Sequence, residues 1–256
     1  MLVIDLMLFG LAGILIWATQ MVWIPFWAAG VINGVGNYWG YRNYESPDAA
    51  TNIIPWGVLI EWQNNHHTYP SSAKFSSKWW EIDMAWVYIR LLERIGLAQV
   101  KKVASKLVIG PTKPLVDTET LRAVLTHRFQ VTSRYGKEVL APVLKEELHE
   151  ANAASRRLLK RARRLLVRDE SLLDNASKSV LERVLGASQS LKTAYSHKQR
   201  LQGIWKRSNL GQESLLHSLQ EWCEQAESTG IQALENFAYR LRGYMRQKAI
   251  DRTAGG

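Results

Sequence analysis

The run LMLFGLAGILIWATQMVWIPFWAAGVINGVGNYWGY, residues 6–41, contains no charged side chain. One transmembrane helix needs about 20 apolar residues, so these 36 residues are long for one span and slightly short for two. Pro25 and the glycines at positions 30, 34 and 36 are places where the run can divide. The run therefore predicts a membrane hairpin, with helices over about residues 2–20 and 22–38.

Two other structures compete with the hairpin. A cleaved signal peptide needs a basic start and a short apolar core, whereas residues 1–5 hold no basic residue and the apolar run is too long. A buried hairpin of a soluble protein is the second alternative. All 33 basic residues lie at or after Arg42, and basic residues near membrane spans stay cytoplasmic. This bias favours the membrane hairpin, with both of its ends and residues 42–256 on the cytoplasmic side.

The composition restricts the partners and the compartment. The net charge of +10 indicates an acidic partner, either nucleic acid or an anionic membrane surface. Cys223 is the only cysteine, so an internal disulfide framework is excluded and a reducing compartment is indicated.

Beyond the uncharged run, the segment Ile60-Glu61-Trp62-Gln63-Asn64-Asn65-His66-His67-Thr68-Tyr69-Pro70 holds the only adjacent pair among six histidines. Neighbouring residues on a helix project about 100° apart, which suits two metals side by side. Neutral imidazole is a frequent ligand of iron and zinc. The alternative is an ordinary pair of surface or capping histidines. Within the run itself, Asn33 and Asn37 share one helix face, where amides usually cap or bind a neighbouring helix.

Residues 71–78 form a polar, serine-rich segment, and residues 79–97 follow with helical spacing of their apolar residues. The spacing predicts an amphipathic helix over 79–97. Its aromatic content suits a membrane interface, and packing on the histidine-bearing element is the equally open alternative.

The segment Gly110-Pro111-Thr112-Lys113-Pro114 predicts a linker. Asp117 to Leu121 has the pattern of a helix start, and charged amphipathic helices follow to about Arg252. Breaks between these helices are expected near Pro142, 169–175, Gly186, Gly203, 209–211 and Gly230.

Residues 156–168 are strongly basic, with leucines at 158, 159, 165 and 166 along one stripe. A solvated face of a helical bundle explains this pattern. Contact with anionic lipid headgroups is the second interpretation. Binding of nucleic acid ranks third, because no known nucleic-acid-binding motif accompanies the basic run. Nucleic acid is therefore an unlikely partner on sequence grounds.

Together these residues resemble the C-terminal part of membrane fatty acid desaturases, specifically the bacterial acyl-CoA Δ9-desaturase type. The resemblance covers about residues 1–105, and residues 40–44 (Gly-Tyr-Arg-Asn-Tyr) and 64–70 (Asn-Asn-His-His-Thr-Tyr-Pro) are its most specific segments. The tail, including residues 222–227 and 230–231, resembles less specifically a helical extension of bacterial members.

The resemblance implies an all-α fold, in which the hairpin corresponds to the third and fourth of four transmembrane helices and a cytosolic helical region follows. It implies the bacterial inner membrane as location, with several spans and a cytoplasmic C-terminal region. The family holds two irons in histidine boxes. By resemblance, the remnant iron ligands here are Asn33, His66 and His67. Asn37 and Gln63 stand at positions where the family has histidine, and the first two histidine boxes are absent.

The expected organisation is a hairpin over 1–41, a cytosolic cap with the remnant histidine box over 42–109, a linker over 110–116 and a basic helical extension over 117–256. The expected function is that of the C-terminal part of a di-iron desaturase, truncated and catalytically impaired, with incomplete or absent iron. The family inserts a cis double bond into a saturated acyl chain of an acyl-CoA or acyl-lipid with O2 and an electron-donor reductase. The alternative is a non-enzymatic, membrane-anchored basic helical protein that binds anionic lipid or a protein partner.

Overall fold

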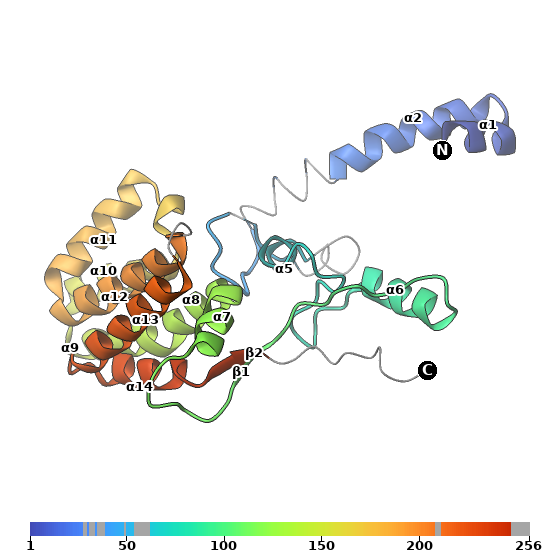
Figure 1. Cartoon of the computed structure of the whole chain (residues 1–256). Helices are drawn as coiled ribbons and strands as arrows, with labels where there is room; N and C mark the ends of the chain where they lie inside the picture. Colours follow the sequence, from blue (N-terminus) through green and yellow to red (C-terminus); the bar gives the residue numbers. More distant parts are fainter. Residues whose placement is uncertain are drawn as a thin grey trace. The chain divides into compact units, whose positions relative to one another are not determined.

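The computed structural model describes residues 1–27, 30, 34, 39–48, 50–53, 62–207 and 211–246 (Figure 1). The chain divides into two compact units. The N-terminal unit comprises residues 1–42 and 48–101, and the C-terminal unit comprises residues 43–47 and 102–256. Most described residues are helical, which confirms the expectation of a helical chain.

The N-terminal unit begins with two short helices, α1 (Leu2–Phe9) and α2 (Ala12–Pro25), which pack against each other. Gly10 lies between them with a φ of 57°, a conformation that favours glycine. A Cβ at Gly13 would lie 2.2 Å from the Asp5 carbonyl oxygen, so the glycine permits this close approach. The expected single helix over 2–20 is therefore wrong in its bounds, because the chain turns at Gly10 after only two turns of helix.

No helix within the described residues combines the length and the apolar character that a membrane crossing requires. The second expected span, over 22–38, falls largely outside the described residues, and so do Asn33 and Asn37. The membrane hairpin consequently stays a prediction.

Two further helices of the N-terminal unit are α5 (Gln63–Thr68) and α6 (Met84–Arg94). The helix expected over 79–97 is thus shorter at both ends. It begins after Asp83, whose carboxylate accepts a hydrogen bond from the Trp86 amide and caps the first turn. It ends where Gly96 adopts a φ of 76°.

The C-terminal unit is a bundle of helices around one apolar core. Its helices are α7 (Thr118–Thr126), α8 (Arg128–Tyr135), the π-helical η2 (Gly136–Leu140), α9 (Ala141–Glu150), α10 (Ala153–Val167), the 3-10 turn η3 (Glu170–Leu172), α11 (Asn175–Ala187), α12 (Gln189–Lys206), α13 (Gln212–Glu227) and α14 (Gln232–Leu241). Strand β1 (Leu107–Ile109) pairs antiparallel with β2 (Tyr244–Arg246), with Val108 opposite Met245.

The expected helix boundaries of this unit are partly confirmed. Asp117 caps α7 by accepting a hydrogen bond from the Thr120 amide, the break over 169–175 separates α10 from α11, and Gly230 turns the chain with a φ of 72°. The break at Pro142 is wrong, because the π-helical turn η2 joins α8 to α9 without interruption, and this wider turn accommodates a proline that lacks an amide hydrogen. Gly203 also lies within α12.

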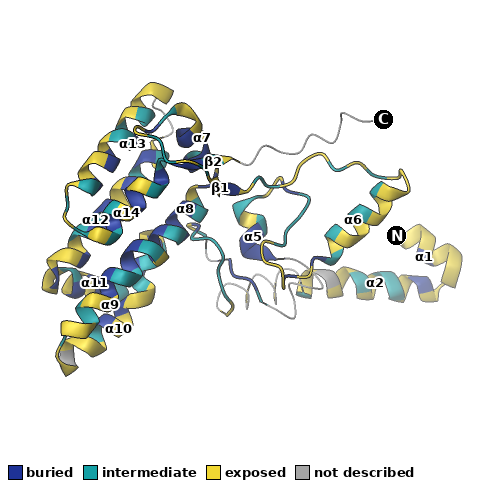
Figure 2. Cartoon of the chain, turned by 90° about the horizontal axis from the view of Figure 1, so that it is seen from below, coloured by how far each residue is buried: buried dark blue, intermediate teal, exposed yellow. Residues whose placement is uncertain are grey.

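The core of the C-terminal unit centres on four aromatic side chains. Tyr135, Trp222 and Phe237 contact one another edge to face, and Tyr244 of β2 contacts Phe237. Two buried polar atoms of the cluster are paired: the Tyr135 hydroxyl donates to the Ala194 carbonyl and the Trp222 indole to the His197 carbonyl, at 2.7 and 2.9 Å. Figure 2 shows the buried face of each helix turned towards this core.

Candidate functional site

The histidine-bearing helix α5 is held by buried amide side chains. Gln63, Asn64 and Asn65 are all buried. The Asn52 side-chain oxygen accepts the Asn64 amide hydrogen at 3.0 Å, and its nitrogen donates to the Asn65 side-chain oxygen at 3.1 Å. The Asn64 side chain donates to the Ala50 carbonyl at 3.1 Å. Segment 50–52 therefore fixes the start of α5 through directional bonds.

Asn65 extends this network to a buried carboxylate. Its side-chain nitrogen donates to the Phe75 carbonyl and to Glu81 Oε2, both at 2.8 Å. Glu81 is 3% exposed, and its other oxygen accepts the Tyr41 hydroxyl at 2.7 Å. Burial, reinforced by this bond to Glu81, raises the pKa of Tyr41 well above its usual range. Tyr41 thus stays protonated as a donor to the carboxylate.

A second buried carboxylate, Asp83, closes the loop that follows α5. Its Oδ2 accepts the backbone amides of Phe75 and Ser76 at 2.6 and 3.0 Å, while Oδ1 caps α6. The Trp62 indole donates to the Ile82 carbonyl at 2.9 Å. Asp83 and Trp62 therefore join loop 71–83 to both helices, α5 and α6, within one polar framework.

The framework presents the two adjacent imidazoles on the outer side of α5. The His66 ring lies edge to face on Phe75, with centroids 4.8 Å apart, and is half-buried. His67 is exposed, and its Nδ1 lies 3.6 Å from the Asp48 carboxylate. The two imidazole centroids are 5.9 Å apart and the rings are nearly perpendicular. The two rings thus lie edge to face at neighbouring positions of the helix.

These residues do not make up an iron centre. Iron in a protein site takes several nitrogen or carboxylate ligands, and within the part of the chain that the structure describes no three His, Cys, Asp or Glu side chains gather as a metal group. Gln63, one turn before His67, offers an amide in place of an imidazole. Asn33 and Asn37 fall outside the described residues. The described residues around α5 hold two imidazoles in place, but they provide too few ligand atoms for two metal ions.

The C-terminal unit carries a second candidate surface on α10. Its buried stripe is Leu159, Ala162 and Leu166, whereas six basic side chains are exposed: Arg156, Arg157, Lys160, Arg161, Arg163 and Arg164. At 100° per residue these six cover an arc of about 160° opposite the buried stripe. None of them forms an ion pair with another residue that the structure describes. The α10 face, as we call these six residues, is therefore a concentrated positive charge available to an anionic partner.

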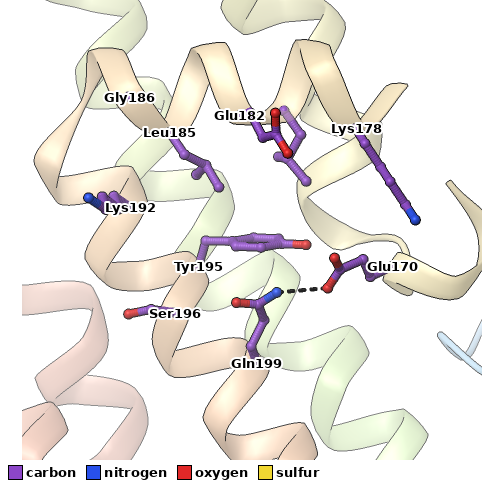
Figure 3. Close-up of a pocket in the computed structure, with 10 residues that line it drawn as sticks. Glu170, Lys178, Glu182, Leu185, Gly186, Lys192, Tyr195, Ser196 and Gln199 are labelled. Carbon is purple, nitrogen blue, oxygen red and sulfur yellow. Dashed lines mark hydrogen bonds between the residues drawn. The ribbon is translucent and has the colours of Figure 1, made fainter. Parts of the chain in front are cut away.

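A groove of about 410 Å³ lies between α11 and α12 (Figure 3). Leu181, Leu185 and Tyr195 form its apolar part, and Gln199 donates to Glu170 at 2.8 Å at one end. Lys178, Lys192 and Glu182 place charges of both signs around it. Ser196, a hydroxyl among the lining residues, donates to the Thr193 carbonyl of its own helix at 2.9 Å.

Lys198 and His127 are two of the buried titratable groups in the C-terminal unit. The Lys198 ammonium donates to the carbonyls of Leu166 and Arg168, both at 2.8 Å, and so binds the free end of α10. Burial lowers the pKa of Lys198 to about 8. His127 is 1% exposed beside Ser105, and burial, with the charges of Arg246 and Arg134, lowers its pKa to about 4. Both side chains are enclosed by the fold, so their surroundings are those of residues with a structural role.

The residues around α5 that the sequence did not single out are Asn52, Glu81, Asp83 and Asp48. They lie up to 19 residues from His67 in the sequence. The fold brings Asp48 to His67, Asn52 and Glu81 to Asn65, and Asp83 to the loop after α5. One signal was present: two acidic residues, Glu81 and Asp83, stand immediately before an apolar helix, where a capping residue is expected.

Comparison with known proteins divides the chain in the same region as the fold. A family model described as a transposase, of the ISL3 DDE type, matches residues 122–249, which is half of the chain. These residues lie within the C-terminal unit. The resemblance had placed the tail with bacterial desaturases on residues such as Trp222, Cys223 and Ala226. All three are buried in the core. Their spacing along the sequence therefore reflects the packing of the helix and says little about the family.

Over about a third of its length the chain matches fatty acid desaturases. It is 42% identical over 97 residues to an sn-2 palmitoyl-lipid 9-desaturase of Nostoc sp. (strain 36), covering 36% of this chain and 32% of that protein. It is 36% identical over 90 residues to an sn-1 stearoyl-lipid 9-desaturase of Anabaena variabilis, covering 34% and 33%. It is 36% identical over 106 residues to the acyl-CoA 5-desaturase AL21 of Anemone leveillei, covering 40% and 33%.

The chain spans about a third of the length of these curated relatives. The relatives act on acyl-lipid and acyl-CoA substrates by name, so they support the desaturase family without separating the two substrate classes. No solved structure matches the chain.

Proposed function

We propose a function for each part of this chain, which belongs through residues 122–249 to the ISL3 family of DDE transposases and over about a third of its length is homologous to fatty acid desaturases. The N-terminal part is the C-terminal section of a desaturase of the bacterial acyl-CoA Δ9 type. Its residues 1–41 anchor it as a hairpin in the cytoplasmic membrane. The reaction of the complete family protein is the O2-dependent insertion of a cis double bond into a saturated acyl chain.

The observation that carries this proposal is the buried polar framework of α5. Asn52, Asn65 and Glu81 are buried with their side chains bonded to one another, which is costly unless every bond is made. The framework fixes the helix that carries His66 and His67, and outer partners in metal sites likewise fix the position of the ligands. Asp48 beside His67 adds a partner for one imidazole.

The chain by itself is catalytically impaired. The donors present do not fit a pair of irons, as described above. The desaturase reaction needs further ligands, the rest of the acyl-chain site and a connection to an electron-donor reductase in addition to residues 1–256.

The test is complementation in a strain that lacks its own desaturase. The full chain is expressed with the N-terminal two thirds of the Nostoc relative, and unsaturated acyl products are measured. We expect no product with the unaltered chain, and product with the double variant Asn37→His and Gln63→His. A variant with His66→Ala added to the two restored positions is the matched control and should abolish the product.

Product formed with the unaltered chain contradicts the impaired site. If the restored variant forms none although both polypeptides accumulate, the section is not a competent desaturase piece, and the proposal fails.

A second candidate function is specific to the C-terminal unit: binding of nucleic acid through the α10 face. The sequence alone ranked anionic lipid before nucleic acid. The transposase match on the same residues now favours nucleic acid, since transposases act on DNA. Six exposed cations without ion pairs among the described residues are the observation that supports it.

Binding of a labelled DNA duplex to the full chain, measured by fluorescence anisotropy at several salt concentrations, tests this candidate. Up to six phosphate contacts predict a slope of log K against log salt as steep as about −5. The variant Arg157→Gln with Arg161→Gln should flatten the slope by about 2. Lys137→Gln with Lys145→Gln, also exposed, makes the same charge change off α10 and should leave the slope nearly unchanged.

If both double variants lose the same DNA affinity, the binding depends on the net charge of the chain and not on the α10 face. If the α10 variant loses binding to anionic vesicles but keeps its binding to DNA, the α10 face binds anionic lipid and not nucleic acid.

A further inference from the structure

Helix α6 presents its apolar side to solvent. On a helix with 100° between residues, Met84, Val87, Tyr88, Leu91, Leu92 and Ile95 share one arc. No residue of α6 is buried, and the exposed fractions on this arc reach 61% at Tyr88 and 54% at Leu91. A surface helix of a soluble protein turns this arc to its core. Figure 2 shows exposed residues interspersed with intermediate ones along α6.

The opposite side of α6 carries its charges in mutual contact. Arg90 forms an ion pair with Glu93 and lies over the Trp86 ring, at 5.7 Å from its centroid. The polar arc is thus satisfied locally, while the apolar arc has no cover among the described residues. The sequence left open whether this helix packs on the histidine element, and its exposure now speaks against such packing.

The turn before α6 adds further apolar surface. Trp79 and Trp80 lie edge to face and are 91% and 46% exposed, and Ile82 is 55% exposed. Lys78, Arg94 and Lys101 are exposed at the two ends of this segment. An exposed apolar patch of this extent marks an interaction site.

Asp83 and Trp62 hold the segment rigidly to the framework of α5. The Asp83 carboxylate caps α6 and also binds the loop amides of Phe75 and Ser76, and the Trp62 indole binds the Ile82 carbonyl. The exposed arc is consequently a built surface with a defined orientation to His66 and His67.

We infer that residues 79–97 bind the surface of an anionic lipid bilayer, with α6 lying in the plane of the interface. Tryptophan and tyrosine prefer the headgroup level of a bilayer, and flanking cations complement anionic lipid. Eleven residues of helix extend about 16 Å, too short to cross a bilayer core of about 30 Å, which favours the in-plane arrangement. The inference extends the proposed membrane role but rests on the geometry of residues 79–97 alone.

The test places a fluorescent probe on each side of α6 in the full chain. Leu91→Cys labels the apolar arc, Glu93→Cys labels the polar arc, and Leu15→Cys reports on the predicted hairpin. The native thiol does not interfere, because Cys223 is buried and burial raises its pKa to about 12. The labelled chains are reconstituted into phosphatidylcholine vesicles with and without phosphatidylglycerol, some carrying lipids with a spin label near the headgroup or at the chain end.

We expect the probe at position 91 to shift to shorter wavelength and to be quenched by the shallow spin label more than by the deep one, more strongly with phosphatidylglycerol. The probe at position 93 should stay accessible to aqueous iodide. A probe at 91 that stays in water overturns the inference. So does a shift at 91 without lipid quenching, which would mean that a second copy or another protein covers the arc.

The probe at position 15 separates the two proposals. Deep quenching at 15 with none at 91 supports the hairpin and refutes the α6 surface. Quenching at 91 with none at 15 supports the α6 surface and refutes the hairpin of the proposed function.

Discussion

The two units of this chain bury opposite kinds of side chain. Among the described residues of the N-terminal unit, the buried apolar side chains are Ala50 and Trp62, while amides and carboxylates such as Asn65, Glu81 and Asp83 are buried. The C-terminal unit buries a continuous apolar cluster from Leu107 to Tyr244. The contrast teaches that the second unit is stabilised by its own core, whereas the first is ordered by directional bonds and leaves its apolar surface exposed.

The largest expected effect is loss of the aromatic core of the C-terminal unit. Phe237→Ala should lower the free energy of unfolding of this unit by about 3–5 kcal/mol, because it removes a fully buried ring that contacts Tyr135, Trp222 and Tyr244. Denaturant unfolding of the full chain followed by circular dichroism measures the change. Tyr239→Ala, on an exposed position of the same helix, is the control and should cost less than about 1 kcal/mol.

A smaller effect is expected from pH through the buried His127. Its folded-state pKa of about 4 lies below the unfolded value of 6.5, so the unfolded chain takes up the proton first. Stability is therefore full above about pH 6.5 and falls as the pH drops towards 4, by at most about 3 kcal/mol. His127→Gln should remove this part of the pH dependence.

The matched control for that measurement is His217→Gln, because His217 is exposed on α13. Its pH profile should follow that of the unaltered chain. Identical profiles for all three chains would show that the pKa of His127 is the same in the folded and the unfolded chain, and the predicted shift would be wrong.

The smallest of the three effects concerns the polar framework. Asn65→Ala leaves Glu81 without one donor and Asn52 without its acceptor, at a cost of about 1–3 kcal/mol. Hydrogen exchange of the His66 amide, which donates to the Trp62 carbonyl, should accelerate by about 5- to 150-fold. Gln99→Ala, an exposed amide of the same unit, should change nothing. Unchanged exchange in Asn65→Ala would mean that α5 is held by something other than its amides.

The comparison of the units also explains which sequence predictions hold. Local patterns predicted the helical class, the cap at Asp117 and the turn at Gly230, because each depends on bonds within a few residues. The same holds for the basic run that became the exposed arc of α10. The desaturase resemblance rested on residues 40–44 and 64–70, and the curated relatives support that family over about a third of the chain.

Only the tertiary structure decided what depends on distant partners. By sequence, segment 107–109 belongs to the region before the predicted linker. In the structure it pairs with segment 244–246, which lies more than 130 residues later in the chain. Pro142 predicts a helix break. The π-helical turn before it instead accommodates the backbone hydrogen bond that proline cannot donate, and the helix continues. Periodicity identifies an amphipathic helix near residue 90 without saying which side is covered. The fold turns its apolar arc outward, because Asp83 binds the amides of Phe75 and Ser76 and Trp62 binds the Ile82 carbonyl, and no local helical pattern encodes these bonds.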